Sequence, residues 1–485
     1  MKNVAGGATL KRKTAWLLVM FFLLGSCGKN DDDYRETGRI RYKLILKPEE
    51  GVVLLEGHIP GLRGDSLAWQ QEQTGGTPAA GAPDRVSNAP DGISFGSVIN
   101  LSEGESRTGA NTSRMDKRHF RAWGGDLIPT PVNEAVFSPV TLEIEGPEGW
   151  AIASSRGIME RHFKLPTLRD LRGMALVAGD YQMSEGRLAN QSLFTMVRSS
   201  FPIPEPEIQN GLRELMVTAL AFWNARLPGP VTVVVDHLDG DSTGVFARNI
   251  PTGGQISIQM LCPQSVSLED PDFYRTFSRA FNRTWIPVAF GNPDFTEAEL
   301  GPTFIEGFHD YVALRIAHYS GLLSDENFAR VLSAFYLDYL AAGGEGKQRN
   351  VEVPAAIRGK ILAFILDLQL HQGSGGQYGI RDFMRSLLQR YHNEHGLKLD
   401  DLLAVVEDLG GLDLATRYEK TYQSRRLPAL ATYLPESGIV LQSPGKVSGK
   451  MSRAVLEGRQ EPLFRFSPQS EAERDFLATF LGRSW

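Results

Sequence analysis

The sequence has very little cysteine, since only Cys27 and Cys262 occur among its 485 residues. If Cys27 carries lipid, as argued below, no disulfide within the chain can form, and the fold must be stabilised by its hydrophobic core. The sequence also lacks an excess of positive charge, because its formal net charge is −6. That balance excludes the basic footprint of a nucleic-acid-binding protein. After the N-terminal segment, no apolar run approaches the length of a membrane span.

The N-terminal segment has the features of a secretory signal. Basic residues 11–13 precede an apolar run over 15–24, which is too short for a comfortable membrane span. The run ends in Leu24-Gly25-Ser26-Cys27, which resembles a bacterial lipobox whose cysteine is acylated and becomes the mature N-terminus. Lipid chains on Cys27 would anchor the protein stably in a membrane. An ordinary signal peptide with an incidental cysteine is the alternative.

We therefore predict a lipoprotein signal peptide over residues 1–26 and an acidic tether over 27–38. Processing removes four positive charges from the formal −6 and leaves about −10. The expected location is the bacterial cell envelope, as an outer-membrane lipoprotein at the periplasmic face or the cell surface. The membrane, reached through Cys27, is the first expected partner.

Residues 39–200 are predicted to form a β-rich domain. Apolar residues alternate with polar ones over 40–46 and 140–144, as in half-buried strands. The stretch 71–96 is rich in Gly, Ala, Pro and Ser, which predicts a long flexible loop.

Residues 201–425 have a different pattern. A β-branched run over 231–235 predicts a buried strand, and alternation over 255–260 predicts an edge-type strand. Helical spacing predicts helices over 207–226, 272–284, 298–319, 324–340, 354–370, 381–391, 399–409 and 412–422. A small sheet followed by a helical lobe indicates an α+β fold. Residues 426–485 are predicted to be a C-terminal extension with a last helix over 471–481.

One motif is present and its expected companion is missing. The stretch Thr303–Tyr311 (TFIEGFHDY) resembles the helix that supplies the third zinc ligand, here Glu306, in gluzincin metallopeptidases. Further similar stretches follow one another in the family's order from about residue 140 to 440. The chain thus resembles the glycyl-aminopeptidase family, distant relatives of leukotriene hydrolase and aminopeptidase N. The resemblance implies a β-sandwich-like domain followed by a thermolysin-like domain.

That family needs H-E-x-x-H on the preceding helix, and no such motif occurs among the nine histidines. Zinc peptidases use two histidines at i and i+4, a third ligand and an open position for water, and a glutamate that accepts the proton of that water. The corresponding positions hold Ser278, Arg279 and Asn282. The resemblance therefore implies a degenerate zinc site, made of these three residues and Glu306, with no catalytic residues and no cofactor. Zinc is expected only under the alternative of an active aminopeptidase with non-standard ligands.

The remaining polar and aromatic residues allow several interpretations. Glu306, His309 and Asp310 share a helix face and could contact one cation, but an ion pair between Glu306 and Arg279 is the preferred hypothesis. A retained groove could be lined by Phe246, Trp285, Phe308, His309 and Asp310, although these aromatics could equally fill the core. The segment 240–244 matches G-x-S-x-G, yet its surroundings favour a polar turn over a nucleophile.

The resulting hypothesis is a catalytically inactive, metallopeptidase-like envelope lipoprotein. Its expected role is binding or scaffolding, with a peptide, a glycan or an envelope protein as the ligand and with no nucleic-acid partner. The alternative is an active zinc aminopeptidase.

Overall fold

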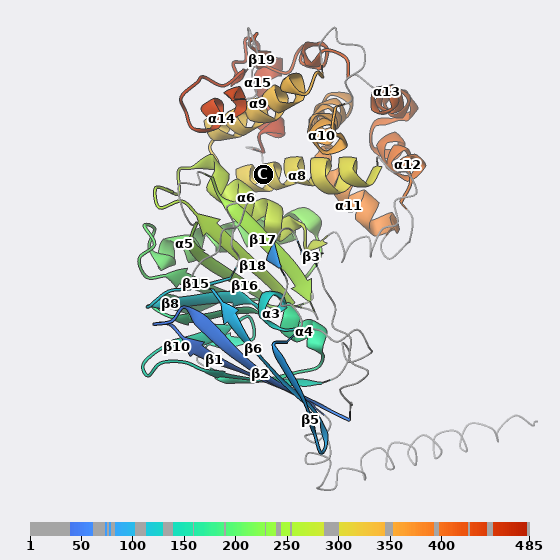
Figure 1. Cartoon of the computed structure of the whole chain (residues 1–485). Coiled ribbons are helices and arrows are strands. Elements are labelled where there is room, and N and C mark those ends of the chain that lie inside the picture. Colours follow the sequence, from blue (N-terminus) through green and yellow to red (C-terminus); the bar gives the residue numbers. More distant parts are fainter. Residues whose placement is uncertain are drawn as a thin grey trace, which may run out of the picture.

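The computed structural model describes residues 39–61, 73–74, 77–78, 83–101, 113–129, 139–158, 160–188, 191–227, 229–238, 244–252, 255–285, 300–344, 353–391, 397–424, 427–443 and 450–482. These residues form an elongated molecule with two β-sheets at one end, a third sheet with helices in the middle, and a helical lobe at the other end (Figure 1). The predicted α+β class, with a sheet domain before a helical region, is confirmed.

Two sheets pack face to face in the N-terminal part. The first has the order β12-β9-β1-β2-β6-β5, with strands β1 (Ile40–Lys47), β2 (Val52–Pro60), β5 (Arg85–Ala89), β6 (Gly92–Asn100), β9 (Val140–Glu145) and β12 (His162–Leu165). The second has the order β11-β10-β13-β8-β7, with strands β7 (Arg114–Met115), β8 (His119–Trp123), β10 (Ala151–Ser154), β11 (Gly157–Ile158) and β13 (Ala175–Gly179). Alternate residues such as Tyr42 and Leu44 enter a core that both sheets share. Two short helices, α3 (Gly124–Leu127) and α4 (Leu168–Arg172), complete this part.

The prediction of a flexible loop over 71–96 is wrong for its second half. Strand β5 and the start of β6 lie in this stretch and pair with each other. Two short strands, β3 (Gln73–Thr74) and β4 (Thr77–Pro78), lie in its first half. The Gly-rich composition is misleading, because glycines of β6 and of its neighbour β2 allow close packing. A Cβ on Gly92 would collide with the backbone of Ile59, and one on Gly57 of β2 would collide with the ring of Phe95.

A third sheet forms the next layer. Its order is β14-β15-β16-β18-β17, with strands β14 (Tyr181–Leu188), β15 (Gln191–Arg198), β16 (Val231–His237), β17 (Phe246–Thr252) and β18 (Gln255–Cys262). Since β14 pairs with β15 and β15 with β16, the third sheet begins at Tyr181, before the predicted domain boundary at residue 201. Strand β18 lies between β16 and β17, so the segment predicted as an edge strand is an interior one. The edge is β17, because its strand pairing is to β18 alone within the described sheet.

A buried ionic cluster joins the two domains. On β8, Phe120 faces the sandwich core, whereas Arg121 faces the third sheet. Arg121 Nη1 donates to Asp236 Oδ2 on β16 at 2.7 Å, and the Tyr181 hydroxyl donates to the same oxygen at 2.7 Å. Arg198 Nη1 lies 3.2 Å from the other oxygen of Asp236. Burial opposes ionisation of this carboxyl, but the two guanidinium groups hold the pKa of Asp236 below its usual value.

The helical part follows the predicted order. It contains α5 (Glu205–Trp223), α6 (Pro271–Asn282), the π-helix η3 (Pro302–Phe308), α8 (His309–Tyr319), α9 (Asp325–Ala341), α10 (Ala355–Gly373), α11 (Ile380–Tyr391), α12 (Leu399–Gly410) and α13 (Leu412–Gln423). The C-terminal residues add η4 (Leu430–Tyr433), β19 (Ile439–Leu441), α14 (Met451–Leu456), β20 (Phe464–Phe466) and α15 (Glu471–Phe480). Phe464 and Phe480 are fully buried in the core of the lobe. The described residues of the predicted C-terminal extension, 427–443 and 450–482, therefore pack into the lobe.

Candidate functional site

The residues predicted to form a degenerate zinc site lie where α6, η3, α8 and α10 pack together. Helix α6 begins with Asp270 as its N-cap and Pro271 in its first turn, a common way to start a helix. Ser278 and Asn282 lie one turn apart on its buried face, and both are fully buried. Glu306 lies on η3, which runs directly into α8. π-Helical turns are rare and are frequent at functional sites.

The polar side-chain atoms of Ser278 and Asn282 are already engaged in hydrogen bonds to neighbouring residues. Ser278 Oγ donates to the carbonyl of Ala313 on α8 at 2.8 Å, and Asn282 Nδ2 donates to the carbonyl of Ser278 at 2.7 Å. Trp223 Nε1 on α5 donates to Asn282 Oδ1 at 2.7 Å. The indole of Trp223 stacks on that of Trp285, with ring centroids 6.0 Å apart. These bonds tie α5, α6 and α8 together.

Glu306 is held by two arginines of α6. Arg279 Nη2 donates to Glu306 Oε2 at 2.9 Å, so the predicted ion pair between them is confirmed. Arg283, one turn further along, donates its own Nη2 to the same oxygen. All three side chains are partly exposed, at 37% each. Glu306 therefore accepts hydrogen bonds from two guanidinium groups.

Asp310 extends this arrangement into the interior. It is only 4% exposed and lies between Arg279 Nε and Lys360 Nζ, the latter 3.0 Å from Asp310 Oδ2. Lys360 reaches it because η3 and α10 pack very closely: a Cβ added to Gly307 would lie 2.5 Å from the Cα of Gly359. Three cations and two carboxylates thus form one group, which we call the charge cluster: Arg279, Arg283, Lys360, Glu306 and Asp310. Its formal charge is positive by one.

His309 is buried beside the charge cluster without joining it. It is 1% exposed, and neither ring nitrogen has a hydrogen-bond partner among the described residues. Its ring stacks on Trp223 at 5.9 Å and meets the edge of Phe304 at 5.8 Å. Burial, reinforced by the positive charge of Arg283, lowers the pKa of His309 to about 3. The imidazole is therefore neutral at physiological pH.

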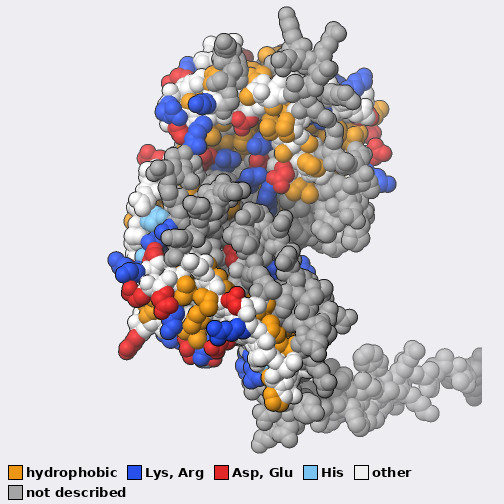
Figure 2. Space-filling model, in the orientation of Figure 1, with side chains coloured by type: hydrophobic (Ala, Val, Ile, Leu, Met, Phe, Trp, Pro, Cys, Tyr) orange, Lys and Arg blue, Asp and Glu red, His pale blue; other side chains and the backbone are white. Residues whose placement is uncertain are grey.

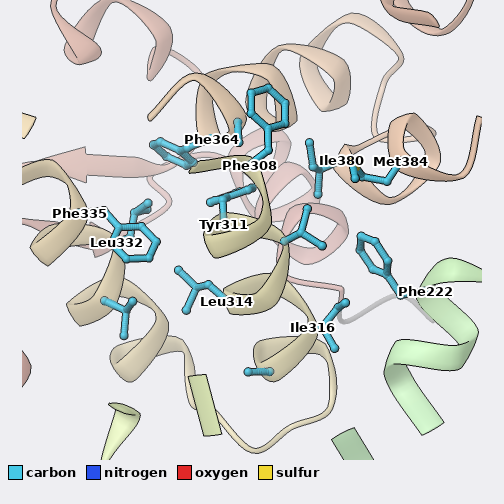
Figure 3. Close-up of a cluster of buried hydrophobic side chains, with 14 of the residues drawn as sticks. Phe222, Phe308, Tyr311, Leu314, Ile316, Leu332, Phe335, Phe364, Ile380 and Met384 are labelled. Carbon is cyan, nitrogen blue, oxygen red and sulfur yellow. The ribbon is translucent and has the colours of Figure 1, made fainter. Parts of the chain in front are cut away.

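The side chains expected to line a groove are mostly inside the molecule. Trp285, Phe308 and His309 are each 1% exposed or less, and Asp310 is bound within the charge cluster. Phe308 points among the apolar side chains of neighbouring helices, as Figure 3 shows. Trp285, Phe308 and His309 therefore form core and line no groove in the described part of the chain. Trp285 and His309 stack on Trp223 of α5, and Phe308 contacts Phe383 of α11. Phe246, on the edge strand β17, is 37% exposed.

The residues at these positions do not fit a zinc ion. Tetrahedral zinc sites take imidazole, thiolate or carboxylate ligands. Ser278 and Asn282 offer a hydroxyl and an amide that are already bonded, and the remaining carboxylate, Glu306, is engaged by two guanidinium groups. Across the described ranges, no group of three or more His, Cys, Asp or Glu side chains is placed to hold a metal ion.

Comparison with known proteins places this site in a known fold. No family model matches the sequence, and no curated protein matches it either. Among solved structures, an aminopeptidase N family protein from Idiomarina loihiensis is similar, with a TM-score of 0.64 and 13% identity, over 84% of this chain and 82% of that one. The fold is that of the aminopeptidase N family. An M1 zinc metallopeptidase from Deinococcus radiodurans is also similar, with a TM-score of 0.44 and 14% identity, over 81% of this chain and 95% of that one.

Two members of the charge cluster were missed by sequence reasoning. Arg283 follows Arg279 at i+4 on α6, so its spacing was a usable signal for a second partner of Glu306. Lys360 gave no such signal, since its approach depends on the packing of η3 against α10.

Several other features lie elsewhere or outside the described residues. A cavity of about 730 Å³ lies on the first sheet, away from the charge cluster, with Arg41, His58 and Lys164 in its wall. The predicted signal peptide, the tether, Cys27 and the serine of the G-x-S-x-G segment lie outside the described residues. Within the described part, no helix is both long and apolar enough to cross a membrane.

Proposed function

We propose that the protein is a catalytically inactive, metallopeptidase-like lipoprotein of the bacterial envelope that binds or scaffolds a peptide or glycan. The observation that carries this proposal is the charge cluster. Where the resemblance places two imidazoles and a general base, the chain has Ser278, Asn282 and Arg279. Arg279 and the nearby Arg283 both bind the carboxylate of Glu306.

Electrostatics supports the proposal. A unit charge pair 4 Å apart interacts by about 4 kcal/mol at an effective dielectric constant of 20, and a dication doubles that energy. Arg279 and Arg283 both lie within ion-pair distance of Glu306, so a metal at this carboxylate would face both of them. Zinc would have to displace these partners and overcome their repulsion without the two histidines that normally offset such costs.

The alternative is an active zinc aminopeptidase whose ligands differ from the family pattern. One measurement separates the two functions: zinc content and hydrolysis of glycine- and alanine-terminated peptides, on the same detergent-solubilised full chain. The proposal expects less than about one tenth of a zinc per chain after dialysis and no turnover that a chelator abolishes. Stoichiometric zinc with chelator-sensitive turnover would overturn it.

The envelope anchor is a separate part of the proposal. Acylation of Cys27 is testable by growing the expressing bacteria with a labelled fatty acid. The label should appear in the protein and be lost in a Cys27→Ser variant that is still exported. Equal labelling of both proteins, or none in either, would leave the binding proposal intact and remove the lipid anchor.

A further inference from the structure

Arg279 and Arg283 of the charge cluster each have hydrogen-bond donors that Glu306 does not use. Each guanidinium contacts Glu306 Oε2 through Nη2. Neither Arg279 Nη1 nor Arg283 Nη1 donates a hydrogen bond to another described residue. Both side chains are 37% exposed, so these donors can reach a ligand.

The position of the cluster suits a ligand from solution. Charged side chains of both signs gather in the hollow of the face drawn in Figure 2, at the level of α6, α8 and α10. Asp310 and Lys360 are the more buried members of the cluster, at 4% and 16% exposed. Arg279 and Arg283 are the more open cations, and their i, i+4 spacing on α6 presents them side by side.

The charge of the cluster defines the ligand. Three cations face two carboxylates, so one more negative charge is needed for neutrality. A guanidinium fork matches a carboxylate in a planar, two-bond geometry. Glu306 already shows that both forks can converge on one carboxylate oxygen. A monoanionic carboxylate fits this balance better than a dianion, which would leave excess negative charge beside the buried Asp310.

We propose that Arg279 and Arg283 form a recognition site for a peptide carboxylate. This inference rests on the proposed binding function and names its ligand class. The bound carboxylate takes the free Nη1 donors of both arginines, and Glu306 competes with it for the same guanidinium groups. The site thereby replaces metal chemistry with anion recognition.

The experiment compares matched peptides by isothermal titration calorimetry on the detergent-solubilised full chain. The probes are N-acetyl-trialanine with a free carboxyl terminus, its C-terminal amide, and N-acetyl-Ala-Asp-Ala amide, which carries its carboxylate on a side chain. We expect at least one carboxylate peptide to bind about tenfold more tightly than the neutral amide, and more weakly in high salt. The two acidic peptides show whether a chain terminus or a side chain supplies the carboxylate.

Two variants test the assignment from opposite directions. Arg283→Gln should weaken the carboxylate peptide about tenfold, with Arg283→Lys in between. Arg213→Gln, at an arginine of α5 that is 52% exposed, is the matched control and should change nothing. Glu306→Gln should strengthen binding about tenfold, because it removes the internal competitor. A purely structural role for Glu306 predicts no such gain.

Each result decides the inference. Equal binding of the acid and amide peptides, no binding of any of the three at millimolar concentration, or weaker binding in a folded Glu306→Gln variant would overturn it. Thermal unfolding of each variant identifies any that fails to fold, and the wild-type peptide comparison then decides alone. Zinc-dependent turnover in the same sample would overturn the proposed function instead, whichever peptides bind.

Discussion

Acidification should destabilise the protein through His309. This side chain is 1% exposed, has no hydrogen-bond partner among the described residues and lies near Arg283, so its pKa falls to about 3. In the unfolded chain a histidine titrates near 6.5. Between these two values the unfolded state binds a proton that the folded state does not. Stability is therefore full above about pH 6.5 and is lost progressively as the pH falls toward 3.

The size of the effect follows from the two pKa values. Each pH unit below 6.5 costs about 1.4 kcal/mol, so lowering the pH from 7.5 to 5.5 should remove about 1.4 kcal/mol through this residue alone. The assay is urea unfolding at both pH values, followed by tryptophan fluorescence. Trp223 stacks directly on His309 and reports on this region.

Two variants isolate the contribution of His309. His309→Leu, similar in volume, should lose about 1.4 kcal/mol less than the wild type between pH 7.5 and 5.5. His162→Gln removes an exposed imidazole on β12 and should behave like the wild type. If His309→Leu and the wild type show the same pH dependence within about 0.5 kcal/mol, the imidazole must accept its proton in the folded state, and the reasoning from burial fails.

Three further substitutions test the packing and the charges around the site. Asp236→Asn leaves the buried Arg121 without its anion and should cost about 3–5 kcal/mol in urea unfolding. Gly307→Ala places a methyl group against Gly359 and should cost about 1–3 kcal/mol, seen as a lower melting temperature. Rebuilding H-E-x-x-H across residues 278–282 should not give stoichiometric zinc in metal analysis, because Arg283 still binds Glu306; a full zinc complement would contradict this.

The helical lobe could be predicted closely because its pattern is local. The helix expected over 399–409 is α12, Leu399–Gly410, and the one expected over 381–391 is α11, Ile380–Tyr391. A repeat of apolar residues every three to four positions fixes both the helix and its buried face. The strands over 85–96 were missed, because the glycines that let β6 pack closely against β2 look like loop residues in the sequence.

One ion pair of the candidate site could be predicted from the sequence. The pairing of Arg279 with Glu306 followed from the need of a carboxylate without a metal for a cation. The contact of Lys360 with Asp310 could not be foreseen, since it joins α10 to α8 through a glycine contact that only the folded chain creates. The burial of Trp285 and Phe308 likewise depends on how α5, α10 and α11 cover them.

The charge cluster gives Glu306 a structural role that does not require zinc. In a metallopeptidase, a glutamate at this position is kept by its bond to zinc. Here Glu306 binds two guanidinium groups, and one of them, that of Arg279, also binds the buried Asp310. Loss of Arg279 would leave Asp310, which is 4% exposed, with Lys360 as its one remaining cation in the cluster. Breaking a buried pair by removing one partner typically costs about 3–5 kcal/mol. Glu306 and Asp310 therefore belong to one electrostatic unit that Arg279 stabilises, and the presence of Glu306 by itself is no argument for zinc.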